Sequence, residues 1–242
     1  MSSIETRRKF LKVTGVAGVA ALAGCSGNGG SGSDTEESES GGSDSSEDMS
    51  SESESDSSET TTRLSWHAGG TGGTYYPLSN EVKTIVESNT DFSLNVQSTG
   101  ASVENVGSLS DGSADFALIQ NDIAYFAKNG TGIETFEGNT IDTLQGVATL
   151  YPETITIVTL ADSGIESLSD LSGATINTGD LGSGTQVNAL QILDAVGISE
   201  FTEQNAGFSQ AAEQLANGDI DASFVVGGWP VGAIEDLANT ND

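Results

Sequence analysis

Short apolar runs alternate with segments of helical periodicity from residue 63 to the end of the chain. Branched and aromatic residues in runs of four to seven favour strands, and apolar residues three and four apart favour helices. The pattern predicts strands over 63–68, 92–97, 115–119, 154–160, 174–177 and 222–226, and helices over 75–88, 101–110, 121–128, 168–171, 186–196, 208–216 and 231–237. Strands and helices that alternate in this way indicate an α/β fold with largely parallel strands.

The predicted elements divide into two groups. A polar stretch over 130–140 separates the first three strands from the β-branched run at 154–160. We place the crossing between the groups near Tyr151, which gives a first lobe over 63–150 and a second lobe over 151–242. The chain is therefore expected to be two-lobed.

Each predicted lobe contains a glycine-rich loop between a strand and the start of a helix, at 69–74 and at 179–185. Unpaired amides and the positive end of the helix dipole meet at such places, so both loops could bind an anion. The hydroxyls of Thr74, Ser183 and Thr185 add donors. The alternative is that the glycines only allow tight turns. A nucleotide fits neither loop, because the second lacks the P-loop lysine and Tyr75 replaces the last glycine of G-x-G-x-x-G, so no cofactor is expected.

Aromatic residues accompany these loops. Tyr75 and Tyr76 follow the first loop, Tyr151 lies at the predicted crossing, and Trp229 follows the last predicted strand. Each could pack in the core instead. Their positions at loop ends of an α/β sheet are those where ligands usually bind.

The first 25 residues are typical of an export signal. Arg7 and Arg8 precede an apolar run over 13–23, which is shorter than the roughly 20 residues that cross a bilayer, and Gly24 and Cys25 follow. The paired arginines resemble a twin-arginine signal, and the sequence before Cys25 resembles a lipoprotein box. We therefore expect a lipid on Cys25 that holds the protein at the outer face of the cell membrane. The alternative for this single cysteine is a buried thiol, and a disulfide is excluded.

Residues 26–62 are almost wholly Ser, Gly, Asp, Glu and Thr. Such a segment cannot bury enough apolar area to offset its chain entropy. It is predicted to be a disordered acidic tether.

The chain is strongly acidic, with 36 Asp and Glu against 7 Lys and Arg, a net charge of -29 and a pI near 4.1. Four of the basic residues lie in the first twelve positions, which leaves Arg63, Lys83 and Lys128. Nucleic acid is excluded as a partner, because phosphate binding needs clustered cations. The lysine-poor composition resembles that of halophilic proteins, in which counterions screen the self-repulsion.

Catalysis has few candidate residues. His67 is the single histidine and ends the first predicted strand, where packing is the expected role. A nucleophile–base pair would need a further histidine or a reactive cysteine, and no D-x-D-x-D-G calcium loop is present. We therefore expect no enzyme activity and no metal site.

Five motifs in order resemble the TAXI family of solute-binding subunits from TRAP transporters. They are Gly70–Pro77, Ser98–Asn105, Val147–Glu153, Gly182–Thr185 with Asn188 and Ala189, and Gly228–Pro230. The resemblance spans residues 63–242. It implies a type II periplasmic-binding fold that closes on a small carboxylate or amino acid such as glutamate and delivers it to ion-driven permease subunits in the membrane.

Carried over to this chain, the resemblance implies a set of ligand-binding residues from both lobes. They are Thr71, Gly73, Thr74, Tyr75, Ser102, Gln120, Tyr151, Ser183, Gly184, Thr185 and Trp229. In this fold the chain normally returns to the first lobe, and this second crossover is missing from the sequence, as in a truncated chain. We expect an open sheet edge and marginal stability from that departure.

Two other functions remain open at this point. An ABC-type solute receptor would have the same fold. A surface sensor or adhesion lipoprotein would use the pocket only structurally.

Overall fold

The computed structural model describes residues 61–240, which belong to one compact unit. The predicted signal at 1–25, with Cys25, lies outside the described residues, as does nearly all of the predicted tether. Within 61–240, none of the helices has the length and apolar character that a membrane span requires.

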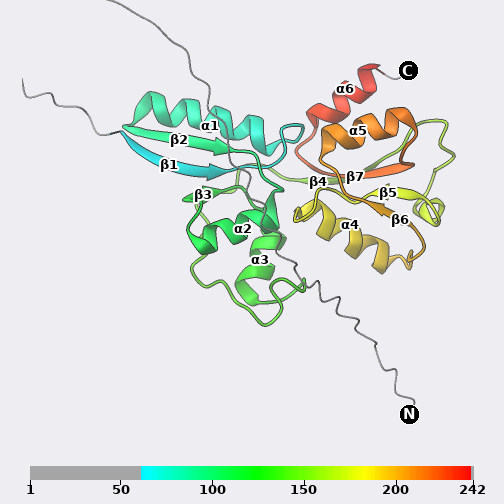
Figure 1. Ribbon diagram of the computed structural model, residues 1–242, viewed down its shortest axis with the longest axis horizontal. Helices are drawn as coiled ribbons and strands as arrows, with labels where there is room; N and C mark the ends of the chain where they lie inside the picture. The colour runs from blue at the N-terminus through cyan, green and yellow to red at the C-terminus, as the bar shows by residue number, and fades with distance from the viewer. Residues whose placement is uncertain (1–60, 241–242) are drawn as a thin grey trace, which may run out of the picture. The chain divides into compact units, whose positions relative to one another are not determined.

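The first lobe, as we call the part from β1 to α3, is built on a three-stranded sheet with the order β2-β1-β3. Both outer strands run parallel to the central β1. Figure 1 shows α1 on one side of this sheet and α2 and α3 on the other. The elements are β1 (Thr62–His67), α1 (Tyr75–Asn89), β2 (Phe92–Gln97), α2 (Ser102–Asp111), β3 (Phe116–Ala117) and α3 (Asn121–Asn129).

The second lobe, from β4 to α6, contains a four-stranded sheet with the order β4-β7-β5-β6. The strands β5, β6 and β7 are parallel, whereas β4 runs antiparallel to β7. In Figure 1, α5 and α6 lie on one side of the sheet and α4 on the other. The elements are β4 (Thr154–Val158), the 3-10 helix η1 (Leu168–Leu171), β5 (Thr175–Asn177), α4 (Gly184–Ala195), β6 (Thr202–Gln204), α5 (Phe208–Asn217), β7 (Ala222–Gly227) and α6 (Gly232–Thr240).

The predicted α/β class is confirmed, with three local differences. The strand β6 was not predicted, because its three residues are polar and exposed and it joins the sheet only through backbone pairing with β5. The strand β3 has two residues instead of the expected five, and β4 departs from the largely parallel pattern.

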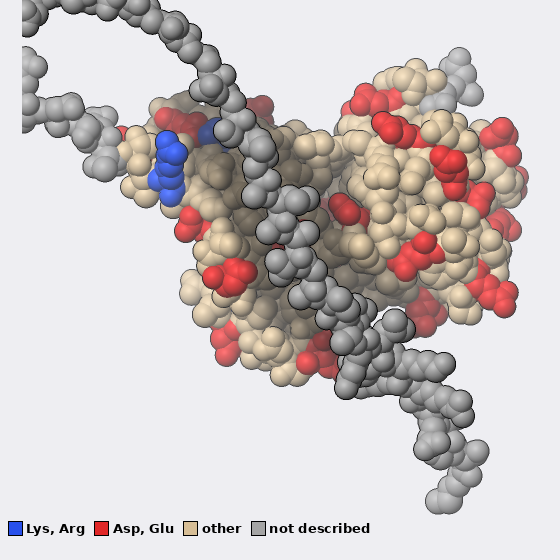
Figure 2. Space-filling model, in the orientation of Figure 1, with Lys and Arg blue, Asp and Glu red and all other residues tan. Residues whose placement is uncertain are grey.

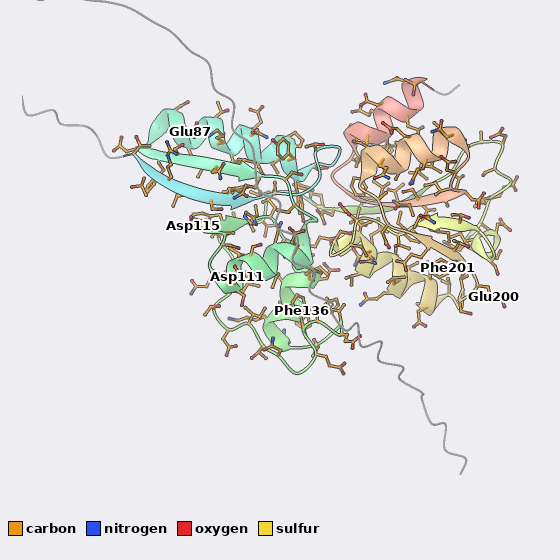
Figure 3. All side chains as sticks on the ribbon, viewed as in Figure 1. Glu87, Asp111, Asp115, Phe136, Glu200 and Phe201 are labelled. Atoms are coloured by element: carbon orange, nitrogen blue, oxygen red, sulfur yellow. The ribbon has the colours of Figure 1, made fainter. Side chains whose placement is uncertain are left out.

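Separate apolar cores stabilise the two lobes. In the first lobe, Val106, Ile123 and Ala127 pack with Phe136 from the segment that follows α3, labelled in Figure 3. The sheet face under α4 is covered by the cluster Leu171, Ile176, Ala189, Leu193, Ile198, Ala222 and Phe224, with the partly buried Phe201 at its margin. The face under α5 has its own cluster of Ala211, Ala212, Leu215, Ile220 and Leu237.

A buried asparagine fixes the strand ends in each lobe. In the first lobe the Nδ2 of Asn105 donates to the carbonyls of Ala68 and Leu118, at 2.7 and 2.8 Å, beyond the ends of β1 and β3. In the second lobe Asn177 donates to the Ser223 hydroxyl and accepts from the amide of Ala206 at 2.8 Å. Both side chains are fully buried, so their hydrogen bonds replace water that cannot reach these groups.

The segment between α3 and β4 contains no helix or strand and exposes apolar side chains. Val147 is 81% exposed and Leu150 is 48% exposed. The neighbouring β3, with only two residues, pairs on one side with β1. The strand β3 is therefore an edge strand of the first sheet.

Acidic side chains are spread over both lobes on the face shown in Figure 2, whereas basic ones gather near β1 and α1. Among the described residues, Lys83 forms an ion pair with Glu87, and Lys128 donates to the carbonyls of Asp142 and Leu144. With only Arg63, Lys83 and Lys128 as basic residues in the described part, most of its acidic side chains have no basic partner.

Candidate functional site

The two predicted glycine loops lie at the same cavity, which has a volume of about 60 Å³. A water molecule needs about 10–15 Å³ on this measure, so the space suits a small solute. Both lobes contribute backbone to the wall. The cavity is lined by Gly69, Gly70, Gly73, Thr74, Tyr75, Thr99, Gly100, Ala101, Ser102, Gln120, Tyr151, Glu153, Asp180, Ser183, Gly184, Thr185, Gly207, Phe208, Val226 and Gly227.

The start of α4 supplies polar groups from the second lobe. Ser183 is the N-cap, and its hydroxyl accepts from the amide of Gln186 at 3.0 Å. Gly184 and Thr185, the first residues of the helix, line the cavity and are buried. The first amides of a helix have no partner within the helix, and the positive end of the dipole favours an anion there.

The starts of α1 and α2 in the first lobe make contacts to the second lobe. The Thr74 hydroxyl accepts from the amide of Gly228 at 3.0 Å and donates to the carbonyl of the same residue at 3.2 Å. At α2, the amides of Val103 and Glu104 donate to the carbonyl of Gly182, at 3.0 and 3.2 Å. The anion-binding role predicted for the first glycine loop therefore does not extend to the hydroxyl of Thr74.

A second set of side chains joins the lobes beside the cavity. The Gln120 amide donates to Asn188 Oδ1 at 3.0 Å, and Asn188 Nδ2 donates to Asp122 at 2.7 Å. A β-carbon on Gly184 would overlap the Gln120 side chain, so only glycine permits this approach without a shift. The lobes are therefore in close contact around the cavity.

An acidic group with aromatic neighbours occupies the wall near the crossing between the lobes. The Tyr151 hydroxyl donates to Glu153 Oε1 at 3.1 Å, and the rings of Tyr75 and Tyr151 meet edge to face with centroids 6.3 Å apart. Burial raises the pKa of the Glu153 carboxyl, the charge of Asp122 raises it further, and contacts with Tyr75, Tyr151 and Gln120 lower it. Burial is also the main cause that raises the pKa of both tyrosines, followed by the Glu153 charge.

Most of the residues predicted for the ligand site come together at this cavity. Those that line it are Gly73, Thr74, Tyr75, Ser102, Gln120, Tyr151, Ser183, Gly184 and Thr185. Thr71 lines a separate hollow with Pro77 and Pro230, and Trp229 is 70% exposed and outside the cavity lining.

Sequence reasoning missed two acidic residues in the lining, Glu153 and Asp180. The first could have been found, because side chains two residues apart in an extended segment lie on the same side and Tyr151 was already predicted. The second, Asp180, lies inside the second glycine loop, which was interpreted as a binding site for its backbone amides and hydroxyls and not for its acidic side chain.

Two further expectations from the sequence concern catalysis by the histidine and binding of a metal ion. His67 is buried at the end of β1 and is not part of the cavity lining. Within residues 61–240, no group of three or more acidic, histidine or cysteine side chains is placed to hold a metal ion.

Two α/β lobes with a ligand-sized cavity between them define a type II periplasmic-binding-protein fold, the fold of solute-binding proteins. The chain belongs to the NMT1-like family, whose model matches residues 67–242.

Solved structures of binding proteins share this architecture at low sequence identity. An ABC uptake transporter substrate-binding protein from Streptococcus pneumoniae with bound histidine has a TM-score of 0.51 and 15% identity, over 75% of this chain and 72% of its own. An ancestral arginine-binding protein bound to arginine has a TM-score of 0.47 and 16% identity, over 74% and 75% of the two chains. The alkanesulfonate-binding protein SsuA from Xanthomonas axonopodis pv. citri, bound to MOPS, has a TM-score of 0.45 and 18% identity, over 68% and 54%. The first of these supports the fold.

Proposed function

We propose that this protein is the extracytoplasmic solute-binding subunit of a TRAP transporter of the TAXI type, which captures a small carboxylate or amino acid such as glutamate. One observation supports it above the others. The loop after β1 and the loop before α4, from two different lobes, line a single cavity. A receptor that closes on its solute needs such an arrangement, because both lobes must contact the ligand to gain from closure.

The chemistry of the wall supports a small polar solute. Hydroxyls of Ser102, Ser183 and Thr185, the Gln120 amide and the start of α4 offer hydrogen bonds, and Tyr75, Tyr151 and Phe208 offer apolar area. The predicted site residues that line the cavity are the ligand contacts in this proposal, except for the Thr74 hydroxyl, which contacts Gly228.

A screen for ligands tests the proposal directly. Thermal unfolding of the full chain in molar potassium chloride, with amino acids, dicarboxylates and monocarboxylates added one at a time, should reveal at least one compound that raises the melting temperature. Calorimetry then gives its affinity. If no compound in these classes binds, the surface-sensor or adhesion function becomes the better proposal.

The ABC-type receptor remains the second candidate, because the solved structure with the highest TM-score among those compared above belongs to an ABC uptake system. Uptake of the identified ligand into vesicles that contain the partner permease separates the two. Transport that needs an ion gradient and proceeds without ATP supports the TRAP proposal. Transport that stops without ATP would replace it by the ABC alternative.

Export and lipid anchoring form part of the same proposal and depend on residues outside the described range. Arg7 and Arg8 would direct export, and a lipid on Cys25 would hold the receptor close to its permease. We expect Cys25→Ser to release the protein from the membrane fraction into the medium, as measured by immunoblotting of both fractions. Retention of the variant in the membrane would contradict anchoring through this residue.

A further inference from the structure

The cavity between the lobes contains negative charge without a cation to balance it. Glu153 and Asp180 line the wall, and none of the lining residues is Lys, Arg or His. The basic residues of the described part lie elsewhere: Lys83 pairs with Glu87, Lys128 bonds the carbonyls of Asp142 and Leu144, and Arg63 is exposed on β1. The charge of Asp122 also acts on Glu153, and it has the same sign.

A half-buried carboxylate in this position is unfavourable unless a partner arrives. Desolvation disfavours the charged form, and hydrogen bonds from neutral groups such as the Tyr151 hydroxyl compensate only in part. Two tyrosine rings lie beside the carboxylate, and aromatic rings attract cations through their faces. A carboxylate with two aromatic neighbours is therefore suited to a positively charged group.

We infer that Glu153, together with Tyr75 and Tyr151, forms a subsite for a protonated amine, and that the cavity selects solutes with an ammonium group over carboxylates that lack one. This inference rests on the proposed solute-binding function and narrows its ligand class. The ligand's carboxylate, where it has one, lies toward the start of α4, where Gly184 and Thr185 line the opposite lobe. Dicarboxylates without an amine are excluded, because they would add negative charge to a negative wall.

Matched pairs of probes test this inference without a variant. L-alanine and L-lactate, L-glutamate and L-2-hydroxyglutarate, and L-leucine and L-2-hydroxyisocaproate differ in each pair only in the amine. Calorimetry on the full chain in molar potassium chloride should show binding by the amine member of at least one pair, and binding of its hydroxy partner weaker by about thirtyfold or more. Equal or tighter binding of the hydroxy member would overturn the inference and leave the solute-binding function intact. Binding by neither member of any pair would overturn the inference, and the wider ligand screen described above would then decide on the solute-binding function.

The variant Glu153→Gln tests whether this carboxylate causes the preference for the amine member of a pair. It preserves the shape of the side chain, and we expect the affinity for the amine probe to fall by about thirtyfold or more while the hydroxy probe binds as before or more tightly. Glu213→Gln, on the exposed face of α5, is the matched control and should bind both probes like the wild type. Circular dichroism of each variant shows whether it is folded.

The opposite protonation state makes a distinct prediction. If Glu153 were protonated and donated to a carboxylate, the hydroxy probe would bind more tightly as the pH falls, with proton uptake that depends on the ionisation enthalpy of the buffer. The groups that face Glu153 are Tyr75 from α1, Tyr151 from its own segment, and Gln120 and Asp122 at the start of α3. Proton uptake on binding of the hydroxy probe would therefore overturn the ammonium subsite.

Discussion

At the scale of single residues, Glu153 lowers the stability of the folded chain when it is charged, and in the inferred subsite it binds the ammonium group of the ligand. Burial raises its pKa above the ordinary value of 4.5, so the folded chain holds this proton more tightly than the unfolded chain does. The direction of the pH dependence of stability follows from that difference in pKa. The contribution of Glu153 to stability is most favourable when the carboxyl is protonated, and it decreases as the pH rises from 4.5 through the higher pKa of the folded state.

We expect Glu153→Gln to be more stable than the wild type at neutral pH in the absence of ligand, because it removes the desolvated charge. The difference should shrink as the pH falls toward 4.5, because a growing share of the wild-type carboxyl becomes protonated. Thermal unfolding of the wild type and the variant between neutral pH and pH 4.5 measures this difference in stability. A variant less stable than the wild type at pH 7 would show that hydrogen bonds to the carboxylate outweigh its desolvation.

Only some of the residues that line the cavity could be predicted from the sequence. Glycines and hydroxyls at strand–helix junctions are visible in a sequence, and most of those predicted lie at the cavity. Trp229 and Thr71 do not, because position beside a loop does not fix the direction of a side chain. The use of the Thr74 hydroxyl to contact Gly228 was also beyond prediction, since that pair is 154 residues apart.

At the scale of elements, the strand ends that surround the cavity are held by buried side chains. The α2 residue Asn105 connects the ends of β1 and β3, and its Oδ1 accepts from the Thr99 hydroxyl at 2.7 Å. This link positions the loop at Gly69, part of the cavity wall. The fold thus depends on an interior polar group as well as on its apolar core.

Asn105→Ala should destabilise the protein by about 3 kcal/mol, because it leaves buried carbonyls without their donor. The change is measured as the free energy of unfolding in urea. Asn95→Ala, on the exposed side of β2, serves as the control and should change stability by less than about 0.5 kcal/mol. Similar values for the two variants would contradict the role of Asn105.

The elements themselves were more predictable than their pairing. The strands β2 and β7 and the α-helices have an apolar pattern that a sequence displays, and their bounds agree with the predictions to within two residues, except that α6 ends three residues later than predicted. The exposed strand β6 has no such pattern, since Thr202, Glu203 and Gln204 pair through the backbone alone. The antiparallel direction of β4 depends on how the chain crosses between lobes, which periodicity does not record.

At the scale of the whole molecule, the two lobes approach so closely that certain glycines have no room for a side chain. A β-carbon on Gly100, in the first lobe, would lie 2.7 Å from the carbonyl oxygen of Leu181 in the second. Backbone cannot move aside as a flexible side chain can. Substitution there should hinder the contact between lobes without affecting either core.

Gly100→Ala is expected to weaken ligand affinity by about tenfold or more, because the binding-competent closed form becomes less populated. Calorimetry gives the affinity, and small-angle scattering reports whether the ligand still makes the molecule more compact. Gly107→Ala is the control: it lies within α2, where an added β-carbon meets nothing within 4 Å. Unchanged affinity in Gly100→Ala would show that closure tolerates the extra methyl group.

The bonds between the lobes also affect how the protein responds to salt concentration. Thr74 with Gly228, Val103 with Gly182 and Gln120 with Asn188 join uncharged partners, and Asn188 with Asp122 has one charged partner. None of these bonds is an ion pair, so dissolved ions weaken them less than they weaken ion pairs. The acidic surface, by contrast, repels itself less as counterions accumulate. Rising ionic strength should therefore increase the melting temperature of the free protein while leaving the compactness of its ligand-bound form almost unchanged.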